Sequence, residues 1–402
     1  MEIRIIRGQN QIGGSVIEIS ATGSSIILDA GLNLDENRYT EIPEVPGLFK
    51  GKAGYDAIII SHYHADHIGL LSNVVAGIPI YMGEKSFTVH AAASGYRKKP
   101  LNFQPLFMKD SMSFQVGAFT ITPFLCDHSA FDSYMILVEA EGKKVLYTGD
   151  YRSNGRKSFA GFLRKLPEVD ALIIEGTVLS RDTFARNITE YQLESQADKF
   201  MKNCMGPVFV MQSATNIDRI VTMYRSAVKA HRIFLEDLYM SEITSAVGGS
   251  IPNPITFNNV RVFMVQGGDE NYKKLTGFGA KRIGRKGIRD EKFVMCVRSS
   301  MKNYLDKLSK EMSFDGGILF YSMWKGYKEN ADTKSFLNFM KDKGVSIHTL
   351  HTSGHADVET IELLIKKTSP KILIPVHTEN AEWFERYRPD IQVERQCDHL
   401  NV

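Results

Sequence analysis

Short apolar runs, separated by glycine-rich or polar turns, dominate the first 175 residues of the chain. β-Branched residues fill these runs, and several runs alternate with polar positions, which is the pattern of strands that bury one face. The runs are EIRII, SVIEI, SSIILDAG, YDAIIISH, IPIYMG, FTITPFL, YMILVEA and KKVLYTGD. Glu141-Gly142 joins the last two runs and predicts a tight hairpin. We therefore expect this segment to be rich in strands.

From about residue 178 the pattern changes to strands that alternate with amphipathic helices. The run GPVFVMQ precedes a helix expected over residues 216–229, and ILFYSMW precedes another over residues 332–343. This alternation is typical of a parallel α/β sheet. After Gly344, the short strand SIHTL, a helix with one apolar face and the strand KILIPVH follow. The sequence contains no internal repeat and no low-complexity segment.

Composition places the chain among folded soluble proteins. Its 402 residues predict two or three structural units. They are 43% hydrophobic and 24% charged, which excludes a mostly disordered or collagen-like chain, and the net charge of +3 identifies no polyanionic partner by itself. The four cysteines form no CxxC pair, and no stretch reaches the roughly 18 apolar residues of a membrane span. We expect a soluble cytoplasmic protein without a membrane partner.

One stretch, residues 273–289, combines seven basic residues with four glycines and no acid. We expect an exposed, mobile loop there. Two interpretations stay open: a solvated surface loop, or a cationic arm against a phosphate backbone. The basic residues that would make the arm are Lys281, Arg282, Arg285 and Lys286.

The strand YDAIII ends in the segment SHYHADHIG, which places His62, His64, Asp66 and His67 within six positions. Imidazole suits zinc and similar ions, and a carboxylate adds charge and a proton acceptor. A tight loop after a strand can direct such side chains toward two ions a few ångströms apart. A lone histidine is more often an ordinary core or surface residue, but four ligand-type residues together indicate a metal site.

Two ions need more ligands than one loop offers, so further donors are expected at later strand ends. His128 follows FTITPFLCD, Asp150 ends KKVLYTGD, and His377 ends KILIPVH. Comparable places at other runs hold Asp29, Glu175 and His355. The histidines interpreted as unrelated to the site are His90, His231, His348, His351 and His399.

Taken together, these residues resemble the metallo-β-lactamase superfamily, whose HxHxDH loop, later histidine, TGD aspartate and final histidine occur here in order. The resemblance covers the first 175 residues and the last 55, and it implies an α/β fold of the αβ/βα sandwich type. Asp150 and His377 are 227 positions apart, far more than closing the sandwich requires. We expect an inserted α/β domain at residues 181–346, with the two parts of the metallo-β-lactamase domain at 1–180 and 347–402.

The insertion, together with EGT at Glu175, SGHA at residues 353–356 and PVH at His377, resembles the β-CASP group of nucleases and most of all its RNase J-type enzymes. The stretch QSATNIDR, residues 212–219, is similar to the loop and helix that open the inserted domain in that group. A histidine at the position of His377 goes with members that act on RNA. The chain ends 25 residues after His377, so we expect no counterpart of the further C-terminal domain of RNase J.

The resemblance implies two divalent ions. Zinc fits the histidine-rich donor set, and manganese is the alternative because it prefers oxygen donors. The ligands implied are His62, His64 and His128 for one ion, Asp66, His67 and His377 for the other, and Asp150 between them. Asp29 is expected to hydrogen-bond backbone amides of the histidine loop and not to contact a metal.

The same resemblance implies catalytic roles. The ions would generate hydroxide from water near neutral pH, and Asp66 could accept the proton as general base. His355 would stabilise the phosphate or protonate the leaving oxygen, while Glu175 holds the imidazole and favours its charged form. Ser353 and Gly354 could bind a neighbouring phosphate through backbone groups.

We therefore expect a two-metal ribonuclease that hydrolyses phosphodiester bonds of single-stranded RNA in RNA processing or decay. It would act as an exonuclease, an endonuclease or both, and the resemblance suggests a homodimer. The alternatives are a hydrolase of a small molecule or of DNA, and an inactive RNA-binding subunit. Trp324 and Tyr321 are of the type that stacks on bases, although aromatic residues in strands more often belong to the core.

Overall fold

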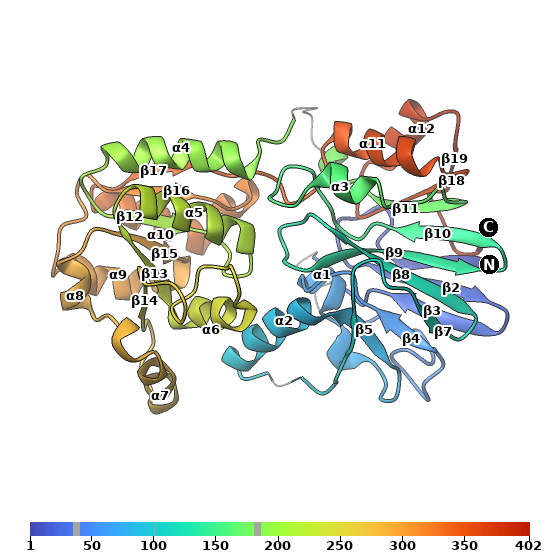
Figure 1. The fold of residues 1–402 in the computed structure, drawn as a ribbon, viewed down its shortest axis with the longest axis horizontal. Helices are drawn as coiled ribbons and strands as arrows, with labels where there is room; N and C mark the ends of the chain where they lie inside the picture. Colours follow the sequence, from blue (N-terminus) through green and yellow to red (C-terminus); the bar gives the residue numbers. More distant parts are fainter. Residues whose placement is uncertain (35–40, 100, 181–185) are drawn as a thin grey trace. The chain divides into compact units, whose positions relative to one another are not determined.

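The computed structural model describes residues 1–34, 41–99, 101–180 and 186–402. The chain divides into two compact units (Figure 1). The first unit comprises residues 1–91, 99–187 and 354–402, and the second comprises residues 92–98 and 188–353. The expected domain boundary between residues 180 and 181 borders the segment 181–185, which lies outside the described residues.

Two seven-stranded sheets form the first unit. The first sheet runs in the order β20 (Leu400–Asn401), β1 (Glu2–Arg7), β2 (Val16–Ala21), β3 (Ser24–Leu28), β4 (Ala57–Ile59), β5 (Ile80–Gly83) and β6 (Leu106–Met108). The second runs β19 (Gln392–Val393), β18 (Ile372–Val376), β11 (Ala171–Glu175), β10 (Lys143–Tyr147), β9 (Ser133–Ala140), β8 (Phe119–Cys126) and β7 (Phe114–Val116). Every strand expected in the first 175 residues falls on one of these strands.

The predicted hairpin is confirmed. β9 and β10 pair antiparallel with Ala140 opposite Lys143, so Glu141 and Gly142 form a two-residue turn. Both residues have positive φ, 53° and 71°, which is the backbone that lets a two-residue turn match the twist of its strands.

The main core of the first unit lies between the two sheets. Apolar side chains of β1–β4 meet those of β8–β11 and β18 in one buried cluster that includes Ile59 and Ile173. A second cluster packs α3 (Phe159–Leu163), α11 (Val358–Thr368) and α12 (Glu382–Tyr387) on the outer face of the second sheet. A third cluster covers the other sheet with residues of α1 (Ala65–Ile68), η1 (Leu71–Asn73) and the start of α2 (Glu84–Tyr96). These layers confirm the expected αβ/βα sandwich.

A six-stranded parallel sheet organises the second unit and confirms the predicted α/β pattern. Its order is β14 (Val260–Phe263), β13 (Ile233–Asp237), β15 (Phe293–Val297), β12 (Val208–Met211), β16 (Ile318–Tyr321) and β17 (Ser346–Thr349). The helices described here are α4 (Glu190–Asn203), α5 (Ile217–Lys229), α6 (Leu238–Val247), α7 (Asp269–Gly277), α8 (Arg285–Arg289), α9 (Lys302–Ser309) and α10 (Ala331–Asp342). Within the described residues, no helix has the length and apolar character needed to span a bilayer.

Side-chain caps determine where several helices begin. Asn216 accepts the backbone N–H of Arg219 at the start of α5, and Asp357 accepts that of Thr360 at the start of α11. Thr189 and Gln192 form a reciprocal capping box on α4. These bonds satisfy backbone donors that the first turn of a helix leaves without an intrahelical partner.

The prediction of a mobile loop over residues 273–289 is wrong in its secondary structure. The segment forms the end of α7, a 3-10 turn (η3, Gly279–Lys281) and α8. Ile288 anchors α8 because its side chain is fully buried. Arg285 pairs with Glu311 at 2.8 Å, and Lys281 Nζ donates to the Phe257 carbonyl at 3.1 Å. A buried apolar residue and these local bonds order a segment whose composition alone indicates a loop.

Glu236 on β13 is fully buried inside the second unit. Its Oε2 accepts a hydrogen bond from Thr244 Oγ1 at 2.8 Å. Burial, opposed by hydrogen bonds from Thr244 and Ser241, raises the pKa of Glu236 to about 8. The carboxyl group is therefore neutral at pH 7 in the folded chain and ionised in the unfolded chain.

We predict that Glu236→Gln removes a pH-dependent loss of stability. Because the folded pKa lies above the ordinary value of 4.5, the folded state binds more protons in that window. The free energy of unfolding therefore falls between about pH 4.5 and 8, by up to roughly 1.4 kcal/mol per pH unit. Glutamine has the same shape and accepts the same bond, so the variant should be more stable than wild type at pH 8.5 but not at pH 4.5. Urea unfolding at both pH values measures the free energy of unfolding of each protein, with Glu329→Gln at an exposed position as control. The same difference between Glu236→Gln and wild type at both pH values would contradict the prediction.

Candidate metal centre

Strands of the first unit end close together, and each delivers polar side chains to the same place. β4 leads into the histidine loop and α1, β8 is followed by His128, β10 by Asp150, and β18 by His377. The donor atoms form three groups, each within 4.8 Å: His62, His64, His128 and Asp150; Asp66, His67, Asp150 and His377; and Asp150, Glu175, His355 and His377. Asp150 belongs to all three groups.

Backbone hydrogen bonds hold the histidine loop against the end of β3. The N–H groups of Ala30 and Leu32 donate to carbonyl groups of the loop at 2.8 Å. Gly31 lies between them, and a Cβ atom there would lie 1.7 Å from the Asp66 carbonyl oxygen. Glycine is required at this position because any side chain would displace the loop.

Asp29 is buried behind the loop and accepts several hydrogen bonds. The backbone N–H and the hydroxyl of Ser61 donate to it at 2.7 Å, and Tyr147 Oη donates to it at 2.7 Å. Its Oδ2 also lies 2.7 Å from His67 Nδ1. This contact directs the other ring nitrogen, Nε2, toward the second group. Asp29 therefore orients a histidine and a backbone amide of the loop.

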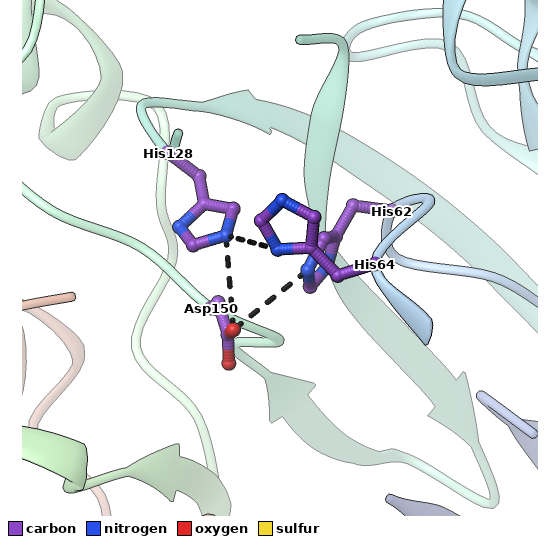
Figure 2. Close-up of side chains that lie close together, drawn as sticks. All are labelled: His62, His64, His128 and Asp150. Carbon is purple, nitrogen blue, oxygen red and sulfur yellow. Dashed lines mark hydrogen bonds and ion pairs between the residues drawn. The ribbon is translucent and has the colours of Figure 1, made fainter. Parts of the chain in front are cut away.

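The first group joins three imidazoles and one carboxylate (Figure 2). His128 Nε2 lies 3.1 Å from His64 Nδ1, and both His62 Nε2 and His128 Nε2 lie 3.7 Å from Asp150 Oδ2. Burial lowers the pKa of all three imidazoles, that of His64 to about 4 and those of His62 and His128 well below the usual value. The rings are therefore neutral at pH 7, which is the form that binds metal ions.

The second group brings together two carboxylates and two imidazoles. His377 Nε2 lies 3.0 Å from Asp66 Oδ2, and His67 Nε2 lies 3.3 Å from Asp150 Oδ2. Burial alone would raise the pKa of both carboxyl groups, but the neighbouring histidines outweigh it and lower both values, so both groups are ionised. Thr177 Oγ1 lies 2.8 Å from His377 Nδ1 and orients that ring.

These residues fit a divalent metal ion. Within the described part of the chain, three of their buried donor atoms have no hydrogen-bond partner: His62 Nε2, His67 Nε2 and Asp150 Oδ1. Leaving such an atom unsatisfied costs about 1–3 kcal/mol. Zinc in proteins binds neutral imidazoles and ionised carboxylates, and His62, His64, His128, Asp66 and Asp150 are in those forms. Burial lowers the pKa of His67, but Asp150, Asp66 and Asp29 outweigh it and raise the value, so a bound cation would have to displace the proton of that ring.

The third group adds an imidazole that is partly open to solvent. The His355 side chain is 21% exposed, and its Nδ1 lies 3.3 Å from Glu175 Oε2. The other Glu175 oxygen accepts the backbone N–H groups of Tyr151 and Ala356 at 3.3 Å. Burial lowers the pKa of His355, but Glu175 and Asp150 outweigh it and raise the value to about 9. Glu175 thus favours the protonated form, which bound cations would oppose.

The remaining expected residues lie in different places. The Gly354 carbonyl lies 2.6 Å from His128 Nδ1 and so orients that ring. Ser353 is a buried residue at the end of the second unit. The second unit also contains Lys281, Arg282, Arg285 and Lys286. The five histidines interpreted as unrelated belong to none of the three groups.

Three residues that support the centre were missed by sequence reasoning. They are Gly31, Ser61 and Thr177. Each stands one or two positions from a predicted site residue. This closeness in the sequence is the signal that could have identified them. Their partners are distant in sequence, since Thr177 contacts a residue 200 positions away.

Family comparisons agree with this geometry. The family described as "Beta-lactamase superfamily domain" matches residues 24–207. The family described as "Zn-dependent metallo-hydrolase RNA specificity domain" matches residues 343–388. Together these two matches span the histidine loop, His128, Asp150, Glu175, His355 and His377.

Similar curated proteins carry ribonuclease names. Ribonuclease J of Sinorhizobium meliloti is 23% identical over 85% of this chain and 60% of its own length. An RNase J-like protein of Methanocaldococcus jannaschii is 27% identical over 54% of this chain and 53% of its own length. Ribonuclease J 2 of Streptococcus pyogenes is 23% identical over 92% of this chain and 68% of its own length. The chain thus spans between about half and two thirds of these relatives.

A solved structure supports the fold. A protein of unknown function from Enterococcus faecalis superimposes with a TM-score of 0.82, covering 100% of this chain and 99% of that one, at 18% identity. This similarity concerns the fold alone.

We predict that divalent metal stabilises the chain through Asp150. Metal bound only by the folded state adds about 2.7 kcal/mol at a concentration 100 times the Kd, so zinc added after chelation should raise Tm by several degrees. Asp150→Ala should lose most of that increase, whereas His399→Ala, outside all three groups, should retain it. Thermal unfolding and metal analysis measure both effects; no increase in the wild type would contradict the metal site.

We also predict that Gly31→Ala disrupts the histidine loop. Its new Cβ meets the Asp66 carbonyl at 1.7 Å, so the variant should lose several kcal/mol of stability and its zinc-dependent stabilisation. Gly95→Ala in α2 is the matched control because nothing lies within 4 Å of its Cβ position. That control should be neutral or about 0.5–1 kcal/mol more stable. Equal stability of the two variants in urea unfolding would refute the close approach.

Proposed function

Because the chain belongs to the metallo-β-lactamase superfamily, we propose that it is a metal-dependent ribonuclease of the β-CASP, RNase J-like kind. It would hydrolyse phosphodiester bonds of single-stranded RNA. The observation that carries the proposal is the placement of the His355–Glu175 pair beside Asp150 and the six donor residues grouped around it. Support also comes from the match to a zinc-dependent RNA specificity domain over residues 343–388 and from relatives named ribonuclease J.

The proposal includes two divalent ions, with zinc as the first choice and manganese as the alternative. The ligands would be His62, His64 and His128 for one ion, Asp66, His67 and His377 for the other, and Asp150 for both. When bound, such ions lower the pKa of a water molecule and neutralise charge that develops on the scissile phosphate.

Side chains of the protein would then carry out the proton transfers. Asp66 is ionised and buried, so it can accept a proton from the attacking water as general base. Glu175 favours the protonated form of His355, whose side chain is partly exposed, so His355 would donate a proton to the leaving oxygen or stabilise the phosphate charge. Glu175 would hold His355 Nδ1 and so orient the ring toward the substrate.

Other residues of the proposal concern RNA binding and biological setting. Gly354 and Ser353 would contact a neighbouring phosphate through backbone groups. The cations of the segment 273–289 would attract the RNA backbone, namely Lys281, Arg282, Arg285 and Lys286. We further propose a cytoplasmic role in RNA processing or decay, by exonuclease or endonuclease cleavage, as a homodimer like that suggested by the resemblance.

We predict that His355→Ala lowers kcat for RNA cleavage by about 10²–10⁴-fold because it removes the general acid. The assay uses 5′-labelled single-stranded RNA and the matching DNA, with added zinc or manganese. His399→Ala, outside the three groups, is the control and should cleave like wild type. Metal analysis should give the same content for all three proteins, because the implied metal ligands remain.

Each outcome of that assay distinguishes a class of enzyme. RNA cleaved by wild type and by His399→Ala supports the proposal, and the product ladder separates exonuclease from endonuclease cleavage. DNA cleaved as readily would remove the preference for RNA. No cleavage of either polymer by metal-loaded protein would refute the ribonuclease proposal and favour a small-molecule hydrolase.

A further inference from the structure

The second unit contains a cavity of about 340 Å³ at the carboxyl end of its parallel sheet. This volume lies in the range of ~300–1,000 Å³ that is usual for ligand sites. Its walls come from the segments after β12, β13, β15 and β16, and the polar lining includes Arg97, Gln212, Asp237, Tyr239, Arg298 and Tyr327.

The cavity lies where the chain leaves the sheet in opposite directions. β12 and β15 are neighbours in the sheet. After β15, α9 packs its Leu305 with Met211 in one apolar cluster. After β12, α5 packs its Tyr224 against Phe234 on β13. The next residue of β13, Leu235, belongs to the same apolar cluster as Leu305 of α9. Because successive side chains of a strand point to opposite faces of the sheet, α5 covers the face opposite to α9. The loops after β12 and β15 therefore diverge and leave a crevice, which is where open α/β sheets bind ligands.

Polar groups in this cavity point to an anionic ligand with hydrogen-bonding edges. Gln212 is 95% buried, since its exposed fraction is 5%, and within the described part of the chain its Oε1 has no hydrogen-bond partner. Arg298 pairs with Asp237 at 2.6 Å, and the guanidinium groups of Arg298 and Arg97 lie 5.4 and 5.8 Å from the centre of the Tyr239 ring. The lining contains two arginines and one acidic residue, so the cavity carries a net positive charge.

An exposed aromatic pair lies beside the cavity: Tyr327 belongs to its lining, and Trp324 contacts Tyr327. Trp324 is 44% exposed and Tyr327 is 45% exposed, and their rings are perpendicular with centroids 5.4 Å apart. Gly326 leaves room for the indole, because a Cβ there would lie 2.1 Å from the Trp324 ring. Tyr321, in contrast, is fully buried, and its Oη donates to the Trp324 carbonyl at 3.0 Å. Of the two aromatic residues expected either to stack on bases or to pack in the core, Tyr321 belongs to the core. Trp324 is exposed and available to a ligand.

We propose that this cavity and the aromatic pair beside it form a nucleotide subsite for single-stranded RNA, built entirely within the second unit. One base stacks on Trp324, the next enters the cavity where the Gln212 amide reads its edge, and Arg298 and Arg97 contact the phosphate between them. The proposal rests on the ribonuclease function above. A free mononucleotide would occupy the cavity but would leave the exposed indole unused, which is why we favour a strand.

Tryptophan fluorescence tests the stacking directly. The chain has two tryptophans, and Trp383 is only 3% exposed, so Trp383→Phe leaves Trp324 as the sole reporter. A single-stranded RNA hexamer added after metal chelation, which prevents cleavage, should quench this fluorescence. If Trp383→Phe does not fold, the difference between wild type and Trp324→Phe gives the same signal. Absence of quenching at saturating RNA would overturn the stacking.

Binding and kinetics provide the second measurement. Base stacking contributes about 1–3 kcal/mol, so Trp324→Ala should weaken hexamer binding by about 5- to 150-fold, and Gln212→Ala should also weaken it. Tyr191→Ala is the control because Tyr191 is 57% exposed but lies outside the cavity wall. With metal present, Trp324→Ala should raise KM for RNA. It should not change the hydrolysis of bis-p-nitrophenyl phosphate, a phosphodiester without a base or a ribose.

The outcomes separate this subsite from the function on which it rests. RNA cleaved by all variants with unchanged Kd and KM would overturn the subsite and keep the ribonuclease. RNA that binds with quenching but is not cleaved would keep the subsite and overturn the ribonuclease. Failure of both binding and cleavage would overturn both. If AMP binds and quenches the Trp324 fluorescence as strongly as the hexamer does, the ligand is a free nucleotide, and the proposal of an RNA strand is overturned.

Discussion

The burial of the Asp150 carboxylate is the constraint on which the rest of the structure depends. Five histidines place a ring nitrogen 3.3–3.7 Å from its oxygens. A buried charge without compensation is strongly unfavourable, so the ends of several strands must deliver cationic or metal-binding partners to one point. Those strands belong to both sheets of the sandwich, and their closeness depends on the core between the sheets. The fold and the site are therefore parts of one packing arrangement.

Supporting residues around this centre hold strained or crowded backbone. Asp29 and His377 both have positive φ, 59° and 52°, which costs free energy for side chains with a Cβ. Both are fixed from outside the site: Asp29 by bonds from Ser61 and Tyr147, and His377 by Thr177. The strain is offset by these bonds, and the orientation of each donor follows from them. Removing a supporting residue should therefore act on the centre without touching a metal ligand.

The second unit interrupts the sandwich between two strands that still pair. β11 and β18 are parallel neighbours, with Ala171 opposite Ile372, although residues 188–353 of the second unit lie between them in the sequence. Glu175 at the end of β11 contacts His355, which follows the insertion. The insertion thus leaves the pairing intact and adds a parallel sheet with a crevice of its own. The metal centre and the proposed nucleotide subsite follow the same rule, since both use the carboxyl ends of strands.

Local sequence signals determined the strands, the Glu141-Gly142 turn, the parallel α/β pattern of the insertion and the types of residue at the metal centre. Each depends on periodicity or on residue types within a few positions, which a single segment displays. Only the tertiary structure decided that Gly31 lies against Asp66, that Thr177 orients His377, that residues 273–289 form helices around Ile288, and that Trp324 is exposed while Tyr321 is buried. These facts depend on contacts between residues far apart in the chain or on which face of an element meets the core. Packing of the whole chain sets them, because local propensities are weak beside the free energy of burial.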